Sequence, residues 1–272
     1  MHPDMASPGA LPLSAWDLAI AAGLVIIAGI VSLALQLRLE RRLGMAAIRT
    51  VVQLLLIGYV LRWVFERQHF AVVMGVAGVM IFAASRAAIG RSSRTFRGAA
   101  WRAFFTLLLT GMLTVFAVTA VIIDVRPWYR PQYMIPLLGM ILGNGLTGIS
   151  LSLDQLLEAF AERRAEVEME LAHGATRWEA ARDALRGAVR RGMIPVVNSM
   201  MVVGIVSLPG MMTGQILAGA DPLGAVKYQI VVMFMLAAAT SLGCIMMAAL
   251  VYKRLFNERH QLRAGLIRRK SS

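Results

Sequence analysis

The sequence predicts an all-α, polytopic integral membrane protein with about seven transmembrane helices. Two observations support this fold class: 58% of the 272 residues are hydrophobic, and they gather into long blocks separated by short charged loops. Each block is long enough to cross about 30 Å of hydrocarbon as a helix. We expect a single transmembrane domain over residues 1–272. Its expected spans are 16–36, 45–65, 70–89, 103–123, 133–153, 193–218 and 228–251.

The second block carries two arginines inside its bounds. Arg49 and Arg62 leave twelve uncharged residues between them. Each lies about one helical turn from an end of the block, where a long arginine side chain can reach the headgroups. We therefore keep 45–65 as a span.

Basic residues predict the orientation of the chain. Residues 37–44, 90–102 and 154–191, together with the tail from Lys253, hold 21 lysines and arginines, against five in the alternate loops. Cytoplasmic loops carry the excess of such residues. The N-terminus is therefore expected outside and the C-terminus in the cytoplasm, which requires an odd number of spans. The net charge of +13 is explained by this topology rather than by nucleic-acid binding.

The fifth span contains small and polar residues. Gly139 and Gly143 form a G-x-x-x-G pattern, which lets helix backbones approach closely. Asn144 and Thr147 are polar at membrane depth, so they should face protein or a cavity. They serve either helix packing or a transport pathway.

The loop 154–191 is expected to form two cytoplasmic helices. Gly174 can end the first, and Thr176 with Glu179 forms a capping box for the second. This loop is either an interfacial helix or a docking element for a cytoplasmic partner. Its pattern E-x-A-x-G-A-T from Glu170 resembles the EAA-type loop of ABC transporter permeases, which inserts into the ATPase subunit. The resemblance assigns coupling to Glu170, Ala172, Gly174, Ala175, Thr176, Trp178 and Glu179.

The sixth span contains a helix breaker. Pro209 lies well inside it and should leave the carbonyl of Ile205 without its helical partner. In lipid such a group must meet water, a neighbouring helix or a ligand. Methionine pairs at 200–201 and 211–212 indicate core packing rather than a metal site. The expected substrate pathway consists of Asn144, Thr147, Asn198, Ser207, Pro209, Thr213 and Gln215.

Several residue types are missing from the expected spans. None of the 15 acidic residues lies deep in a span, and no P-loop is present. We expect no catalytic residue, no metal site and no cofactor in this chain. A transporter of this kind needs a partner that binds ATP and magnesium. The alternative is a self-sufficient channel or passive pore.

Three stretches resemble one family closely: "IPLLGMILGN", "GMIPVVNSMMVVGIVSLPGMMTGQILAG" and "AVKYQIVVMF". The chain is similar to the UPF0014 family of membrane proteins, whose FetB-like members are permeases of iron-export ABC systems. The resemblance implies a bacterial inner-membrane permease, two copies of which pair with two ATPase subunits and export iron or another substrate. The sequence departs from the family pattern at Leu146–Thr147, where Met-Asn is expected, and at His173, where leucine is usual. The first departure leaves the substrate open.

Overall fold

The computed structural model describes residues 14–269 and shows a helical protein. Residues 1–13 and 270–272, the two ends of the expected domain, lie outside the described residues. Two-residue strands β1 (Arg94–Thr95) and β2 (Arg268–Arg269) pair antiparallel. The helices are α1 (Ala15–Ala34), α2 (Glu40–Arg67), α3 (Phe70–Arg91), α4 (Ala99–Phe116) with a π-helical extension (Ala117–Ile122), α5 (Pro131–Glu162), α6 (Arg164–Ala172), α7 (Arg177–Val202), α8 (Gly210–Leu217), α9 (Pro222–Leu255) and a 3-10 turn (Ala264–Leu266).

Six helices within residues 14–269 are long and apolar enough to cross a membrane, which confirms the expected class. They are α1, α2, α3, α4 with its extension, α5 and α9. These helices correspond to the expected spans 16–36, 45–65, 70–89, 103–123, 133–153 and 228–251.

The remaining expected span, 193–218, is not one helix. Helix α7 ends at Val202, residues 203–209 are non-helical, and α8 begins at Gly210. Gly204 adopts φ +84°, a left-handed conformation that suits glycine, and Pro209 takes the extended N-cap position of α8. The second cytoplasmic helix and the start of this span, expected to be separate, form the single helix α7. Pro195 lies inside α7 without ending it.

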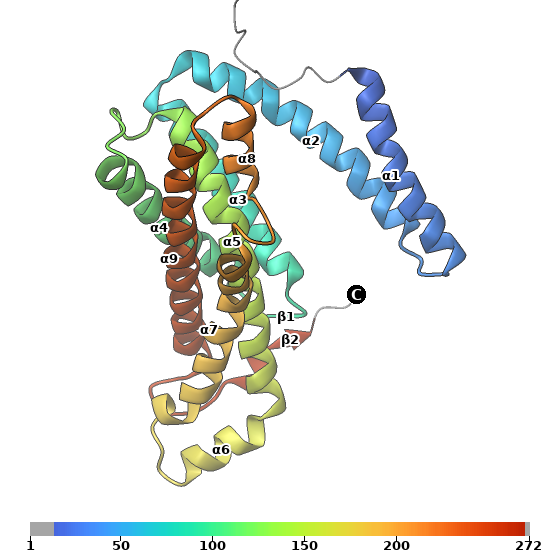
Figure 1. Ribbon diagram of the computed structural model, residues 1–272. Coiled ribbons are helices and arrows are strands. Elements are labelled where there is room, and N and C mark those ends of the chain that lie inside the picture. The colour runs from blue at the N-terminus through green and yellow to red at the C-terminus, as the bar shows by residue number, and fades with distance from the viewer. Residues whose placement is uncertain (1–13, 270–272) are drawn as a thin grey trace, which may run out of the picture.

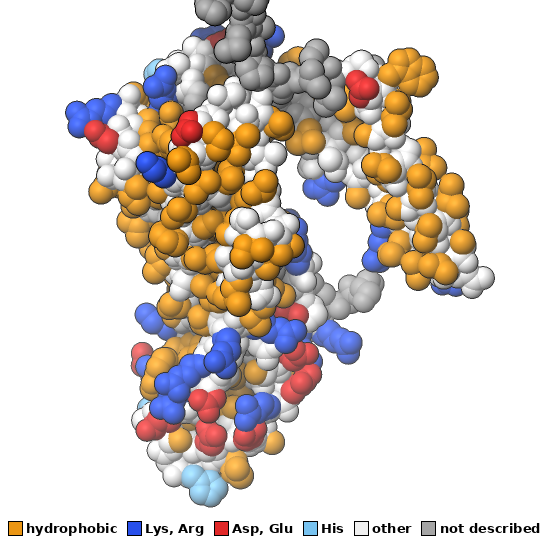
Figure 2. All heavy atoms as spheres, viewed as in Figure 1, with side chains coloured by type: hydrophobic (Ala, Val, Ile, Leu, Met, Phe, Trp, Pro, Cys, Tyr) orange, Lys and Arg blue, Asp and Glu red, His pale blue; other side chains and the backbone are white. Residues whose placement is uncertain are grey.

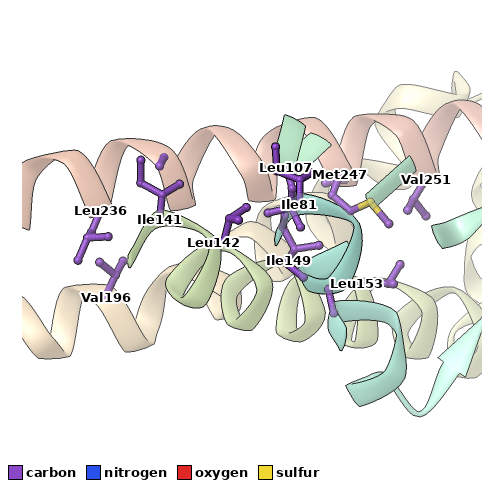
Figure 3. Packing of buried hydrophobic residues seen from close by; sticks show 14 of the residues in the cluster. Ile81, Leu107, Ile141, Leu142, Ile149, Leu153, Val196, Leu236, Met247 and Val251 are labelled. Carbon is purple, nitrogen blue, oxygen red and sulfur yellow. The ribbon is translucent and has the colours of Figure 1, made fainter. Parts of the chain in front are cut away.

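Helix α5 runs through the middle of a bundle formed with α3, α4, α7 and α9, whereas the α1–α2 hairpin stands to one side (Figure 1). The core is apolar and contiguous along α5. Leu138, Ile141 and Ile149 of α5 are almost fully buried. Figure 3 shows this packing, with Leu236 of α9 and Val196 of α7 facing one another beside Ile141.

Glycines allow α5, α7 and α9 to pack closely at one height in the bundle. A Cβ added to Gly192 of α7 would lie 2.5 Å from the Cys244 Sγ of α9, closer than real Cβ contacts allow. On α5 the tightly packed glycine is Gly148, whereas a Cβ added to Gly143 would meet nothing within 4 Å. The G-x-x-x-G pair is therefore not the closest contact of α5.

Apolar and charged side chains separate along the molecule. Figure 2 shows apolar side chains covering the middle of the bundle and much of the α1–α2 hairpin, with most charges at the end formed by α6 and the start of α7 and a smaller group at the opposite end. Arg91, at the end of α3, donates from Nη1 to the Thr147 Oγ1 at 3.3 Å. Thr147 therefore lies at the edge of the apolar part of the bundle, where the charged side chain of Arg91 reaches it.

Candidate functional site

A sharp turn joins α6 to α7 at the charged end of the molecule. Gly174 adopts φ +94°, so glycine suits this position. Thr176 then caps α7: the Glu179 N–H donates to the Thr176 Oγ1 at 3.3 Å, and the Thr176 N–H donates to the Glu179 Oε2 at 2.7 Å. The capping box expected from the sequence is present. Hydrogen bonds from the backbone and side chain of Thr176 hold the pKa of Glu179 below its usual range.

The turn presents its residues to solvent. Of the seven residues expected to couple to an ATPase, Ala175 is half-buried, and Glu170, Ala172, Gly174, Thr176, Trp178 and Glu179 are exposed. Trp178 is 54% exposed and packs edge-on against Tyr252 of α9, with ring centroids 5.9 Å apart. We call residues 169–179 the elbow. It offers an aromatic and acidic surface on a rigidly capped helix.

Helix α7 connects the elbow to the interior of the apolar band. Its 26 residues correspond to about 39 Å of continuous helix. One face is buried against α5 and α9 through Ala181, Leu185, Ala188 and Val196. The helix therefore runs without a break from the elbow to the non-helical segment.

The non-helical segment, residues 203–209, lies where α7 stops. The Val202 carbonyl accepts from the amides of residues 205–207 at 3.0–3.4 Å. Within residues 14–269, the carbonyls of Gly204, Ile205 and Val206 accept no hydrogen bond. The unpaired Ile205 carbonyl was expected, but it arises because the helix ends at Val202, not because Pro209 interrupts a helix.

The structure places the expected pathway residues in two groups. Ser207, Pro209, Thr213 and Gln215 belong to the non-helical segment and α8, and exposed Asn198 lies one turn before the end of α7. Thr213 is satisfied locally, because its Oγ1 donates to the Pro209 carbonyl at 3.2 Å.

The other two expected pathway residues, Asn144 and Thr147, lie on α5 and bond within it. The Asn144 Nδ2 donates to the Met140 carbonyl at 3.0 Å, and the Thr147 Oγ1 donates to the Gly143 carbonyl at 3.1 Å. None of the seven expected pathway residues is among those that line the cavity beside the non-helical segment.

A cavity of about 440 Å³ opens between the non-helical segment and α9. Its one polar side chain is Gln229, which is 6% exposed and whose Oε1 has no hydrogen-bond partner in the described part of the chain. The Gln215 Oε1 of α8 is likewise buried and unpartnered. The cavity is lined by Met200, Val203, Gly204, Leu208, Met212, Val226, Gln229, Ile230, Met233 and Phe234.

Gln229 was missed from the sequence, although a signal was present. It is an amide inside the apolar run "YQIVVMF", the kind of residue that marks a functional position in a span. Among the described residues, no group of three or more His, Cys, Asp or Glu side chains could hold a metal ion.

Known membrane proteins resemble this chain over most of its length. A family model described as an uncharacterised protein family, UPF0014, matches residues 15–256. A UPF0014 membrane protein of Synechocystis is 40% identical over 83% of this chain and 87% of its own. The probable iron export permease protein FetB of Escherichia coli is 34% identical over 93% and 96%. The Arabidopsis protein ALUMINUM SENSITIVE 3 is 33% identical over 88% and 86%. No solved structure matches.

Proposed function

The chain belongs to the UPF0014 family, and on that premise we propose that it is the permease subunit of an ABC exporter in the bacterial inner membrane. A separate cytoplasmic ATPase would bind ATP and magnesium and drive the transport. The substrate would be iron, or another metal or a metabolite. Support for iron comes from the relative named as a probable iron export permease, which covers 93% of this chain.

The observation that carries the proposal is the continuity of α7. The helix begins at Arg177 beside an exposed elbow and ends at Val202, where the non-helical segment starts. A displacement of the elbow by a partner would move the far end of the same helix. The proposed mechanism is that nucleotide binding in the ATPase shifts α7 and thereby opens or closes the path at residues 203–209.

Several acceptors near this site have no hydrogen-bond partner among the described residues. They are the carbonyls of residues 204–206 and the Oε1 atoms of Gln215 and Gln229. Acceptors suit a cargo that brings donors, such as the water ligands of a hydrated cation, the hydroxyl groups of a chelate or a polar metabolite. The thioethers of Met200, Met212 and Met233 line the same cavity but prefer soft ions, so they are a poor match for bare ferric iron.

The same segment supports assembly as a homodimer. Ile205 is 88% exposed and Val206 is 79% exposed in the single chain, and their backbone carbonyls accept no hydrogen bond within the described residues. Lipid cannot satisfy such carbonyls, so protein or water must face them. A second copy of the permease on the other side of the path would provide protein contacts and enclose water beside these carbonyls.

Co-purification tests the partnership directly. The chain would be expressed with a candidate ABC ATPase from the same genome and isolated through a tag on the permease. We expect the ATPase to be retained by the wild type and lost from Trp178→Ala. The matched control is Trp101→Ala, because Trp101 is 63% exposed on α4, away from the elbow.

Transport completes the test. Inside-out vesicles containing both subunits should accumulate iron when ATP is supplied, and Trp178→Ala should abolish the accumulation. Iron movement without any ATPase would instead support the alternative of a self-sufficient channel. Retention of the ATPase by Trp178→Ala and by a Gly174→Val variant would show that the elbow is not the docking surface.

A further inference from the structure

A second cavity lies outside the proposed pathway, at the charged end of the molecule. It has a volume of about 770 Å³ and is formed by the end of α9, the start of α7 and the tail that follows α9. Two aromatic side chains, Tyr252 and Phe256, form part of its wall. The lining residues are Arg177, Tyr252, Lys253, Phe256, Asn257, Glu258, Arg259, Gln261 and Arg263.

The charges of this cavity are unbalanced. Among the described residues, four cationic side chains line it, from Arg177, Lys253, Arg259 and Arg263, against the single carboxylate of Glu258. Lys253, Arg259 and Arg263 are exposed, and none takes part in an ion pair within residues 14–269. Guanidinium groups without a carboxylate partner present a fork that matches phosphate oxygens.

The tail that carries these charges is held in a defined shape. The Gln261 N–H donates to the Asn257 Oδ1 at 2.8 Å, and the Arg263 N–H donates to the Leu255 carbonyl at 2.7 Å. The tail then returns to the bundle, where β2 pairs with β1. Arg259 and Arg263 are therefore presented by a closed turn, which lowers the entropy lost on binding.

The tail also touches the first residue of α7. The Arg177 backbone N–H donates to the His260 Nδ1 at 2.9 Å, and the Arg177 Nη1 donates to the Asn257 carbonyl at 3.2 Å. The Arg177 guanidinium lies over the Tyr252 ring, with Cζ 6.0 Å from its centroid. These contacts fix Arg177 at the wall of the cavity.

We propose that this cavity binds a phosphate group. The group belongs either to an anionic lipid headgroup of the cytoplasmic leaflet or to a soluble phosphate compound, since both present the same oxygens to the four cations. Basic pockets at the cytoplasmic ends of membrane helices suit such headgroups. A bound phosphate would bridge α9, the tail and Arg177, and so hold the tail against the start of α7.

Binding to the full-length chain tests the proposal without any ATPase. In nanodiscs of phosphatidylcholine, pyrophosphate would be titrated by calorimetry. In a second arm, native mass spectrometry would compare retention of phosphatidylglycerol with that of phosphatidylcholine. The test variant is Lys253→Gln/Arg259→Gln/Arg263→Gln. The matched control is Arg182→Gln/Arg186→Gln/Arg190→Gln, which removes the same charge from exposed positions on α7.

The proposal expects binding in at least one arm, weakened about tenfold or more in the test variant and by less than about twofold in the control. Binding of pyrophosphate alone identifies a soluble source, and selective retention of phosphatidylglycerol identifies a lipid. Absence of both, or equal losses in the two variants, overturns the proposal. Polyglutamate is the third probe: if it binds and the phosphate probes do not, the cavity recognises an acidic protein surface and the proposal fails.

Discussion

Gly192 of α7 lies directly against Gly148 of α5. A Cβ added to Gly192 would be 2.7 Å from the Gly148 carbonyl oxygen, and one added to Gly148 would be 3.0 Å from that of Gly192. Cys244 of α9 closes the same crossing, since its Sγ would lie 2.5 Å and 3.2 Å from the two added atoms. The helix that joins the elbow to the non-helical segment therefore crosses its neighbours at a point without space for a methyl group. If α7 moves, it must therefore slide against α5 and α9, because the crossing leaves no free space.

The first prediction concerns this crossing. Gly192→Ala should lower the free energy of unfolding by about 1–3 kcal/mol, because the added methyl overpacks three helices at once. The measurement is thermal or denaturant unfolding in detergent. Gly187→Ala on the same helix is the control, since its added Cβ meets nothing within 4 Å and alanine favours a helix. Equal destabilisation by both changes would show that the crossing is not a special contact.

The second prediction concerns Pro209. Its φ of −64° and ψ of 143° are accessible to alanine, so Pro209→Ala should lower the free energy of unfolding by no more than about 0.4–1 kcal/mol, through the greater freedom of the unfolded chain. Alanine releases the fixed φ and loosens the junction between the non-helical segment and α8, so ATP-driven transport in vesicles should fall several-fold. Pro136→Ala on α5 is the control and should leave transport intact. Normal transport by Pro209→Ala would remove this proline from the gating mechanism.

The third prediction is a pH dependence of the elbow. The pKa of Glu179 lies below its usual range because the folded capping box binds its charged form. Its contribution to stability is therefore fully present above the unfolded pKa, and it is lost as the pH falls through the lower folded pKa. We expect the wild type and Glu179→Gln to differ in melting temperature at neutral pH. The difference should disappear below about pH 4, which lies just under the ordinary pKa of glutamate.

Two other variants separate the capping box from general electrostatics. Thr176→Ala should reduce the same pH-dependent difference without abolishing it, because alanine loses the hydroxyl bond to Glu179 but keeps the backbone N–H that donates to the same carboxylate. Glu168→Gln changes an acid on α6 that pairs with Arg164, and it should leave the difference in place. A Thr176→Ala protein with the full wild-type pH profile would contradict the assignment.

The sequence predicted the regular parts of this fold and missed its connections. Apolar blocks identify α1 and α3 well, because length and hydropathy are local properties of the chain. The same reasoning divided α7 between Arg191 and Met193, since its polar first half and apolar second half have different compositions. The continuity of α7 is a tertiary result: α5 and α9 bury one face along both halves.

Only part of the candidate site could be predicted, because sequence patterns report local motifs and not the packing between helices. The elbow residues form a local motif, and the capping box between Thr176 and Glu179 could be predicted from a four-residue spacing. Gln229 could not be placed, because its burial against the end of α7 depends on how α9 packs. Asn144 was assigned to the pathway by polarity alone, whereas its side chain bonds within its own helix.

The fourth prediction separates a pathway role for Gln229 from a packing role. The Gln229 Oε1 is buried without a hydrogen-bond partner among the described residues, which costs free energy. Gln229→Met keeps the length of the side chain and removes the amide, so it should raise the free energy of unfolding by about 1–2 kcal/mol. If the amide meets cargo in the cavity, the same variant should lose most ATP-driven transport.

Thr240→Val is the control, because the Thr240 Oγ1 is also buried and unpartnered but does not line the cavity. It should stabilise the protein and leave transport unchanged. If Gln229→Met stabilises the protein and transports normally, the amide takes no part in the path and the cavity has a packing role.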